Sequence, residues 1–125
     1  FLKIYNQYIG MKELAGFLSE TSLTVCPYTD ATQSGVIMTS FALGRPVIAS
    51  NVGGLGEMIE HGRTGLLVPP KDSKALADAI ITLLTDQLEL GAMERNIETD
   101  YNVGNKSWDV IAKKYIEFYN TIIKA

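Results

Sequence analysis

The sequence predicts an α/β fold with a parallel sheet, and three consecutive stretches carry this prediction. Residues 23–27 form a short apolar run rich in strand-forming side chains. Residues 36–43 place apolar side chains at a helical period, and residues 46–49 form a second buried-type strand. A strand, a helix and a strand in so few residues make a parallel crossover unit. Ligands of such folds bind where strands lead into helices, so the polar loop before residue 36 is the first candidate site.

Two elements precede this unit. Residues 1–8 alternate imperfectly between apolar and polar side chains, which predicts an edge strand or a broken strand. Residues 11–19 carry apolar side chains on one face and predict a short amphipathic helix. The single cysteine, Cys26, falls in the strand that follows. Since it has no partner for an internal disulfide, we expect it to be a buried, small apolar residue.

A short helix and a strand should follow the second strand of the unit. Residues 55–59 are predicted to be helical, with Glu57 in the first turn, where a carboxylate suits the helix dipole. Residues 66–68 read as a strand closed by two prolines. His61 and Arg63 lie in the turn between these elements, and we interpret both as exposed turn residues.

Three helices are predicted in the C-terminal half. Asp72 or Ser73 caps the first, and its predicted core face consists of Leu76, Ile80, Leu83 and Leu84. Residues 87–102 form a second, more weakly periodic helix. Ser107 caps the last helix, which carries a broad apolar stripe of Trp108, Ile111, Ala112, Tyr115, Tyr119 and Ile122. Such a stripe is more often core than a sugar-binding platform, and without a partner it would favour self-association.

The loop before residue 36 has the composition of a phosphate site. Ser34 can cap the following helix, and Gly35 lets the backbone come close to a ligand. The N–H groups of the first helical turn, including that of Val36, carry partial positive charge suited to phosphate. Thr32 and Gln33 add neutral hydrogen-bonding side chains.

Two glycines after the second strand belong to the same prediction. Gly53 and Gly54 would bring a second backbone wall to the crevice. The simpler interpretation is a capped helix and two tight turns, because small polar residues also serve ordinary caps and turns. Spacing alone does not choose between these interpretations.

Composition limits the classes of function. The chain has 125 residues, 46% of them hydrophobic, which fits one folded domain over residues 1–125. A net charge of −3 gives no electrostatic reason to expect nucleic acid as a partner. No apolar run reaches the roughly 20 residues of a membrane span, and no Cys/His spacing suits zinc. Since the chain begins at Phe1, we expect a fragment of a longer protein.

The motifs in the first two thirds of the chain resemble a known family. The run PYTDATQSGVIMTSFALGRPVIASNVGGLGEMIEHGRTGLLVPPKD is similar to the donor-binding domain of retaining glycosyltransferases of family 4, also called group 1. The combination of GRPVIAS, GGLGE and HGRTGLLVPP is much more specific than a glycine motif alone. The resemblance implies the truncated C-terminal half of a GT-B fold, built as a Rossmann-like three-layer αβα sandwich.

The resemblance also implies a function and its partners. A nucleotide-diphosphate sugar would bind through its phosphates at Thr32, Gln33, Ser34, Gly35 and Val36, with Gly53, Gly54 and Glu57 at the donor-sugar crevice. The glycosyl group would pass with retention to an acceptor on an N-terminal domain missing from this chain. The basic catalytic residues would precede Phe1, so the isolated fragment should be inactive. No metal or other cofactor is expected. The family further suggests a cytoplasmic, bacterial-type enzyme of polysaccharide biosynthesis, with peripheral membrane association open for the full protein.

The sequence departs from the family at one pair of positions. Ala31 and Thr39 occupy the places of the family's two spaced glutamates, of which the second usually binds the donor ribose. Thr39 could replace that glutamate only weakly. The alternative is therefore a non-catalytic nucleotide-binding or regulatory α/β module. A phosphate-receiver domain is disfavoured because no acidic cluster closes an early strand, and a dinucleotide oxidoreductase because no GxGxxG motif follows a strand.

Overall fold

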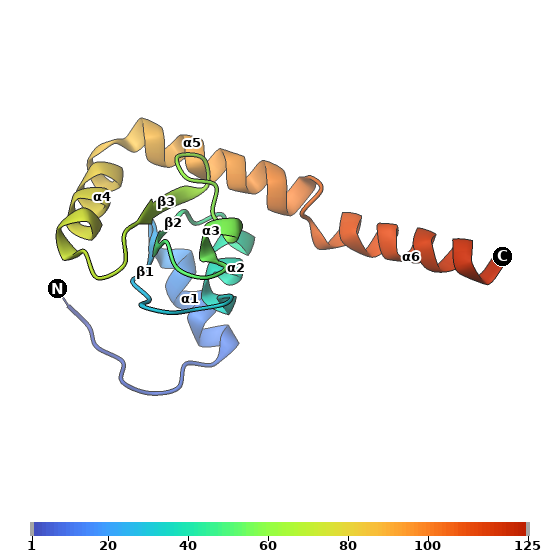
Figure 1. Ribbon diagram of the computed structural model, residues 1–125, viewed down its shortest axis with the longest axis horizontal. Coiled ribbons are helices and arrows are strands. Elements are labelled where there is room, and N and C mark those ends of the chain that lie inside the picture. Colours follow the sequence, from blue (N-terminus) through green and yellow to red (C-terminus); the bar gives the residue numbers. More distant parts are fainter. Residues whose placement is uncertain (1, 125) are drawn as a thin grey trace.

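The computed structural model describes residues 2–124 and contains the predicted α/β body (Figure 1). In chain order its elements are α1 (Met11–Glu20), β1 (Thr24–Cys26), α2 (Gly35–Ala42), β2 (Val47–Ser50), α3 (Leu55–Met58), β3 (Gly65–Val68), α4 (Ser73–Thr85), α5 (Gln87–Ile97), the π-helical segment η1 (Glu98–Val103) and α6 (Trp108–Lys124). Every helix and strand predicted between residues 11 and 85 is present, with bounds that differ by only one or two residues.

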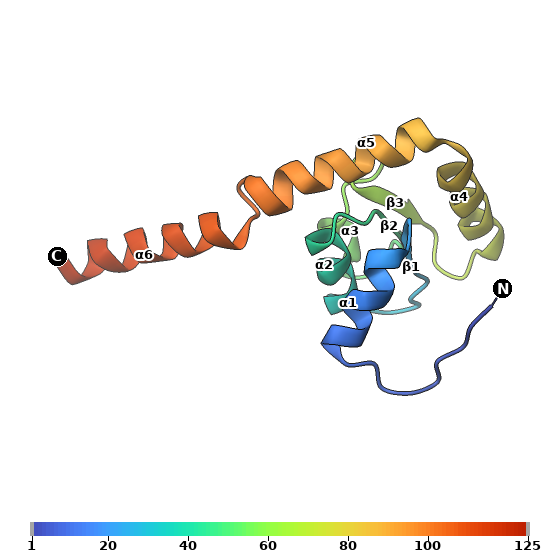
Figure 2. The same ribbon diagram turned by 180° about the vertical axis from the view of Figure 1, so that it is seen from behind.

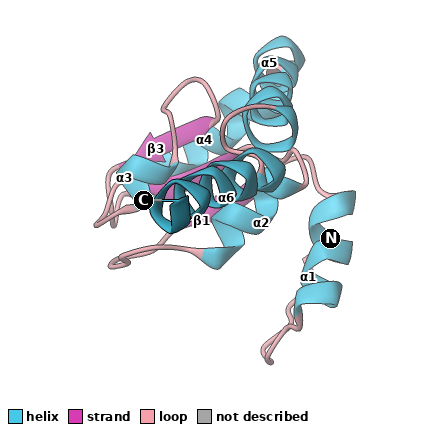
Figure 3. Ribbon diagram, turned by 90° about the vertical axis from the view of Figure 1, so that its right-hand side faces the viewer, coloured by secondary structure: helices cyan, strands magenta, loops and turns pink. Residues whose placement is uncertain are grey.

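The sheet has three parallel strands in the order β1-β2-β3. Figure 3 shows the strands in magenta among the helices. Val25 pairs with Ile48 in one ladder, and Ile48 pairs with Leu66 in the other. The central strand β2 is buried along its whole length, which explains its continuous apolar sequence. Because all three strands run the same way, their carboxyl ends meet at one edge.

Helices cover both faces of the sheet and give three layers (Figures 1 and 2). Alternate residues of β2 point to opposite faces, so Val47 and Ala49 join one apolar cluster and Ile48 joins the other. The first cluster includes Ile37 and Phe41 of α2 and the expected buried Cys26. The second contains residues of α4 and α5, namely Ala79, Leu83, Leu90 and Met93. This is the Rossmann-like sandwich that the family resemblance implied.

The predicted N-terminal strand is absent. Residue 1 lies outside the described residues, and residues 2–10 form no strand. Leu2 and Ile4 are largely exposed, while the Tyr5 ring lies 4.8 Å from the ring of Phe17 on α1. A strand needs a neighbour to satisfy its backbone groups, and residues 2–10 pair with none of the three strands. The segment instead packs one aromatic ring on α1.

Two predictions for the C-terminal helices need correction. Leu84 was placed on the core face of α4, but it is 48% exposed, and Ala79 occupies the buried face beside Leu83. The buried face of α4 is narrower than predicted, because Leu84 is rotated by about 100° around the helix axis from Leu83. The helix predicted over residues 87–102 is α-helical only to Ile97 and continues as the π-helical η1.

The last helix, α6, extends away from the sheet body (Figure 1). Ser107 caps it as predicted, because its hydroxyl accepts a hydrogen bond from the Val110 N–H at 3.3 Å. None of its described residues is buried, so within residues 2–124 the apolar stripe is not core and lacks the partner that would cover it. No helix among those residues is long and apolar enough to cross a membrane.

Candidate functional site

The N-terminus of α2 is the centre of the candidate site. The Ser34 hydroxyl accepts a hydrogen bond from the Ile37 N–H at 3.3 Å and so caps the helix as predicted. The Tyr28 hydroxyl lies 3.4 Å from the same oxygen. Within residues 2–124, the N–H groups of Gly35 and Val36 have no protein acceptor. Two donors at the positive end of an α-helix are therefore free for an anion.

A pocket borders the N-terminus of α2. It has a volume of about 360 Å³ and is lined by Gln33, Ser34, Gly35, Met38 and Met58. Thr32, Gln33 and Gly35 are exposed, so the end of the helix is accessible to solvent even though Ser34 itself is buried. Val36 packs its side chain against the core and offers the site only its backbone.

The glycine pair after β2 touches the same loop. Gly53 has a φ of +47°, and a Cβ atom there would lie 1.8 Å from the Ala31 carbonyl oxygen. A Cβ atom at Gly54 would lie 2.1 Å from the Thr32 carbonyl oxygen. Only glycine permits this approach, because real Cβ atoms never come so near another atom. The loops after β1 and β2 are thus packed backbone to backbone beside α2.

Two predicted site residues, Thr39 and Glu57, do not line the pocket at the N-terminus of α2. The Thr39 hydroxyl donates to the Gly35 carbonyl oxygen at 2.8 Å and lies 3.7 Å from the Met11 sulfur on α1. Thr39 does not line the pocket before α2. Glu57 is exposed on α3, and its neighbour Met58 is the residue that lines this pocket.

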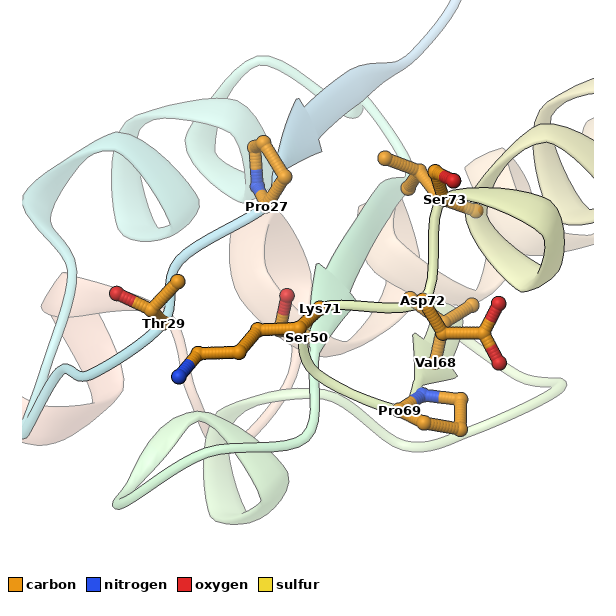
Figure 4. A pocket seen from close by; sticks show the side chains of 9 residues that line it. Pro27, Thr29, Ser50, Val68, Pro69, Lys71, Asp72 and Ser73 are labelled. Atoms are coloured by element: carbon orange, nitrogen blue, oxygen red, sulfur yellow. The ribbon is translucent and has the colours of Figure 1, made fainter.

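A second pocket lies at the carboxyl ends of all three strands (Figure 4). Its volume is about 230 Å³, and its lining is Pro27, Thr29, Ser50, Val68, Pro69, Lys71, Asp72, Ser73 and Leu76. Sequence reasoning assigned none of these residues to a site. The available signal was that polar or charged residues follow each strand, at Thr29, Ser50 and Lys71.

Arg63 has a larger role than that of an exposed turn residue. Its guanidinium donates to both oxygens of Asp100 in η1 and to Glu60 at 3.0 Å. Lys106 donates to Glu60 at 2.9 Å, and its ammonium lies 5.1 Å from the centre of the Tyr101 ring. These hydrogen bonds hold the pKa of the Asp100 and Glu60 carboxyls below their ordinary values. The network fixes the turn before β3 to η1, and its residues were separated too widely in sequence to be recognised.

These features define a class of protein. A parallel sheet covered on both faces, with a capped helix opening toward a pocket at the edge of the sheet, is the architecture of a Rossmann-like nucleotide-binding domain. The model of the family described as "Glycosyl transferases group 1" matches residues 4–86. The chain therefore belongs to that family.

Curated relatives agree with this assignment. The chain is 30% identical over 111 residues to D-inositol 3-phosphate glycosyltransferase of Corynebacterium urealyticum, with 89% of this chain and 26% of the relative covered. It is 35% identical over 86 residues to a GDP-mannose-dependent phosphatidylinositol monomannoside mannosyltransferase of Mycobacterium tuberculosis, with 66% and 21% covered. The chain thus spans about a quarter of the length of these relatives.

Solved structures show the same fold. Sucrose-phosphate synthase of Thermosynechococcus elongatus superimposes with a TM-score of 0.76 at 33% identity, covering 93% of this chain and 29% of that one. HepE of Anabaena, in complex with UDP, gives a TM-score of 0.69 at 25% identity, with 84% and 29% covered. The chain has the fold of the C-terminal half of a GT-B enzyme.

Proposed function

We propose that the chain is the donor-binding part of a retaining glycosyltransferase that takes a nucleotide-diphosphate sugar. The observation that carries the proposal is the open N-terminus of α2, where the amides of Gly35 and Val36 lack protein acceptors. Membership of the group 1 family supplies the reaction class. Together they favour a diphosphate as the anion that accepts these hydrogen bonds.

The chain's own contribution to catalysis would be electrostatic. When the glycosyl bond breaks, negative charge develops on the departing phosphate oxygen. Donors already fixed by the helix and by the Ser34 cap stabilise that charge without reorganising. They lower the barrier to the extent that they interact more strongly with the transition state than with the bound substrate. The exposed side chains of Thr32 and Gln33 can add neutral donors to the same oxygens.

The rest of the reaction would require parts of the protein outside this chain. We place the acceptor on an N-terminal domain and the basic catalytic residues before Phe1, since within residues 2–124 no basic side chain lines the pocket before α2. The 125 residues alone should then fold without transferring sugar. A radiolabelled-donor assay on the isolated chain tests this, and measurable transfer would show that the catalytic groups are misplaced.

Nucleotide titration tests the proposal directly. Isothermal titration of the intact protein with uridine, guanosine and adenosine diphosphates should find at least one that binds, and the preferred base identifies the donor class. If none binds at millimolar concentration, the transferase proposal fails. Adding a chelator should leave the affinity unchanged, because we propose that the site uses amides and not a metal ion; a chelator-sensitive affinity would contradict that part.

A matched pair of glycine substitutions tests the position of the site. A Cβ atom at Gly35 would meet nothing within 4 Å, and the same is true of Gly16 in α1. Gly35→Val should therefore leave the helix content intact while its side chain fills space at the pocket, abolishing diphosphate binding. Gly16→Val is the control and should bind like the parent protein. Normal binding by Gly35→Val would refute the close backbone approach at this loop.

A second candidate is a nucleotide-binding module without catalysis. Ala31 and Thr39 stand in place of the family's paired glutamates. The Thr39 hydroxyl already donates a hydrogen bond to the Gly35 carbonyl oxygen. The two candidates separate in one comparison. An enzyme hydrolyses or transfers the sugar of its bound donor, whereas a module binds the same nucleotide sugar and returns it unchanged over hours.

We further propose a cytoplasmic setting and a role in bacterial polysaccharide synthesis. The free thiol of buried Cys26 is compatible with the reducing environment of the cytoplasm. The exposed apolar stripe of α6 should make the isolated chain self-associate. Sedimentation of Tyr119→Lys against the parent chain tests this, with more monomer expected for the variant. Flotation of the full protein with liposomes tests for peripheral membrane association.

A further inference from the structure

The pocket at the carboxyl ends of the three strands is separate from the opening before α2. The two share the loop between β1 and α2, but they have no lining residue in common. The apolar part of its lining consists of Pro27, Val68, Pro69 and Leu76. Its polar groups come from the ends of all three strands, so the fold itself gathers them at one point (Figure 4).

Ser50 is the first sign that a ligand belongs there. The residue is only 3% exposed, and its hydroxyl takes part in none of the side-chain hydrogen bonds of the described chain. The oxygen is not among the fully buried unsatisfied atoms, so it stays accessible from the pocket. It lines the pocket, and Figure 4 shows its oxygen turned toward the space between Pro27 and Lys71. A hydroxyl that faces a pocket and has no protein partner is free to hydrogen-bond water or a ligand there. A ligand atom in the pocket would satisfy it.

Lys71 provides the positive charge. Figure 4 shows its side chain extending across the pocket toward Thr29, and it makes no ion pair with any residue of the described chain. Lys71 is also the one non-glycine residue among residues 2–124 with a positive φ, of 58°. A left-handed conformation is unfavourable for lysine, and the conformation fixes the direction in which its side chain leaves the backbone.

Asp72 is the opposing charge in the lining. One of its carboxylate oxygens accepts a hydrogen bond from the Ala75 N–H at 2.9 Å, so the group is directed to the first turn of α4. In Figure 4 it points away from the Lys71 ammonium. The positive end of the 13-residue helix α4 offsets part of its charge. Asp72 therefore weakens anion binding in this pocket without neutralising Lys71.

We propose that this pocket binds the oxyanion of a second ligand, a carboxylate or phosphate group, separately from the diphosphate site. Lys71 Nζ and the hydroxyls of Ser50 and Thr29 would contact the oxyanion, and the apolar lining would contact the carbon atoms attached to it. The inference does not require that the chain bind a nucleotide.

Titration of the intact protein followed by amide NMR tests the proposal. Inorganic phosphate and acetate are added separately at constant ionic strength, and the amides of Ser50, Lys71 and Ser73 should shift in a saturable way. The tighter probe identifies the phosphoryl or the carboxylate class. Lys71→Gly should weaken the binding about tenfold or more, because it removes the charge-assisted contact while suiting the positive φ. Lys71→Arg should restore most of it.

Asp72→Asn separates this proposal from binding of a neutral ligand. Asparagine can still cap α4, so the fold is kept, and loss of the negative charge should tighten phosphate binding several-fold. Ser50→Ala should weaken it. The control is Lys74→Gln, since Lys74 pairs with Asp78 on α4 outside the pocket and should not affect the titration.

Three results would overturn the proposal. One is equal shifts at Lys12 and Lys74, which would mean non-specific attraction to surface lysines. Another is unchanged binding in both Lys71→Gly and Ser50→Ala. The third is loss of the Ser50 and Lys71 shifts once a bound nucleoside diphosphate saturates Gly35 and Val36, which would make this pocket part of the diphosphate site. Failure of the diphosphate site alone would leave the Ser50 and Lys71 shifts intact.

Discussion

Helices α2 and α6 have similar apolar content but opposite surroundings. The 8-residue α2 buries Ile37, Ser40 and Phe41, whereas the 17-residue α6 buries none of its described residues. In the figures α2 lies against the sheet and α6 projects beyond it (Figures 1 and 2). The face of α6 exposes large side chains that include Trp108, Tyr115, Phe118 and Ile123. Helical periodicity thus specifies an apolar face but not what covers it.

The difference implies that the two regions contribute unequally to stability. Burial of apolar area is the main favourable term in folding, and α2 obtains it from β1 and β2. The exposed face of α6 gains little within the described chain, so its helix there depends on local propensity and its Ser107 cap. The following predictions, ordered from the largest effect to the smallest, test that contrast.

Replacing Gly65 in β3 should break the body. A Cβ atom there would lie 1.9 Å from the Val47 carbonyl oxygen in the central strand. Gly65→Val should therefore destabilise the fold by more than about 4 kcal/mol, which for a small domain means a largely unfolded chain. Circular dichroism during urea unfolding measures this. The control, Gly16→Ala in α1, has open space and should be neutral or slightly stabilising; a folded Gly65→Val protein would contradict the strand register.

Truncating one aromatic side chain in each helix compares the regions directly. Phe41 is fully buried and packs against the tilted ring of Tyr101 with ring centres 4.9 Å apart, so Phe41→Ala should cost about 3–5 kcal/mol. Trp108 is 76% exposed, so Trp108→Ala should change stability by no more than about 0.5 kcal/mol. Equal losses in urea unfolding would mean that α6 packs on the body in solution.

The ionic network of Arg63, Asp100, Glu60 and Lys106 joins the body to the segment that leads into α6. The folded-state pKa values of Asp100 and Glu60 are lowered, so their contribution is complete above the ordinary pKa of an unfolded carboxyl, near 4. It is lost as the pH falls through the lowered folded values. Asp100→Asn should therefore lower stability at pH 7 and make the loss of stability below about pH 4 shallower. Urea midpoints from pH 7 to pH 2 measure both, and an unchanged slope would exclude Asp100 from the acid transition.

Lys71→Gly should have a small effect, and in the opposite direction. Glycine adopts the positive φ of position 71 without the steric cost that lysine bears, although it adds entropy to the unfolded chain. The net expectation is a gain of about 0.5–1 kcal/mol in the free energy of unfolding. Lys71→Ala serves as the control, because it removes the amine but keeps the Cβ atom and should not stabilise. A destabilised Lys71→Gly would mean that the amine makes a contact required for folding.

Most of the fold was predictable because its signals are local. Residues 23–50 specify a strand, a capped helix and a buried strand through their apolar periods and the Ser34 cap, and each of these is found in the structure. The strand prediction near the N-terminus was wrong because alternation of apolar and polar residues does not supply a neighbouring strand, and residues 2–10 pair with none. The prediction that Leu84 is core was wrong because successive helical residues are rotated by about 100°. That rotation turns Leu84 from the core toward solvent, and a short apolar run in the sequence does not show which of its residues faces the core.

The site divides in the same way. The sequence by itself determined where α2 begins, since a serine cap followed by glycine sets the local backbone geometry. Only the tertiary structure decided how closely Gly53 and Gly54 approach Ala31 and Thr32, that Arg63 reaches Asp100, and that Ser50 and Lys71 share a pocket. These contacts join residues far apart along the chain, and their distances are set by how strands align and helices pack, which no local pattern encodes.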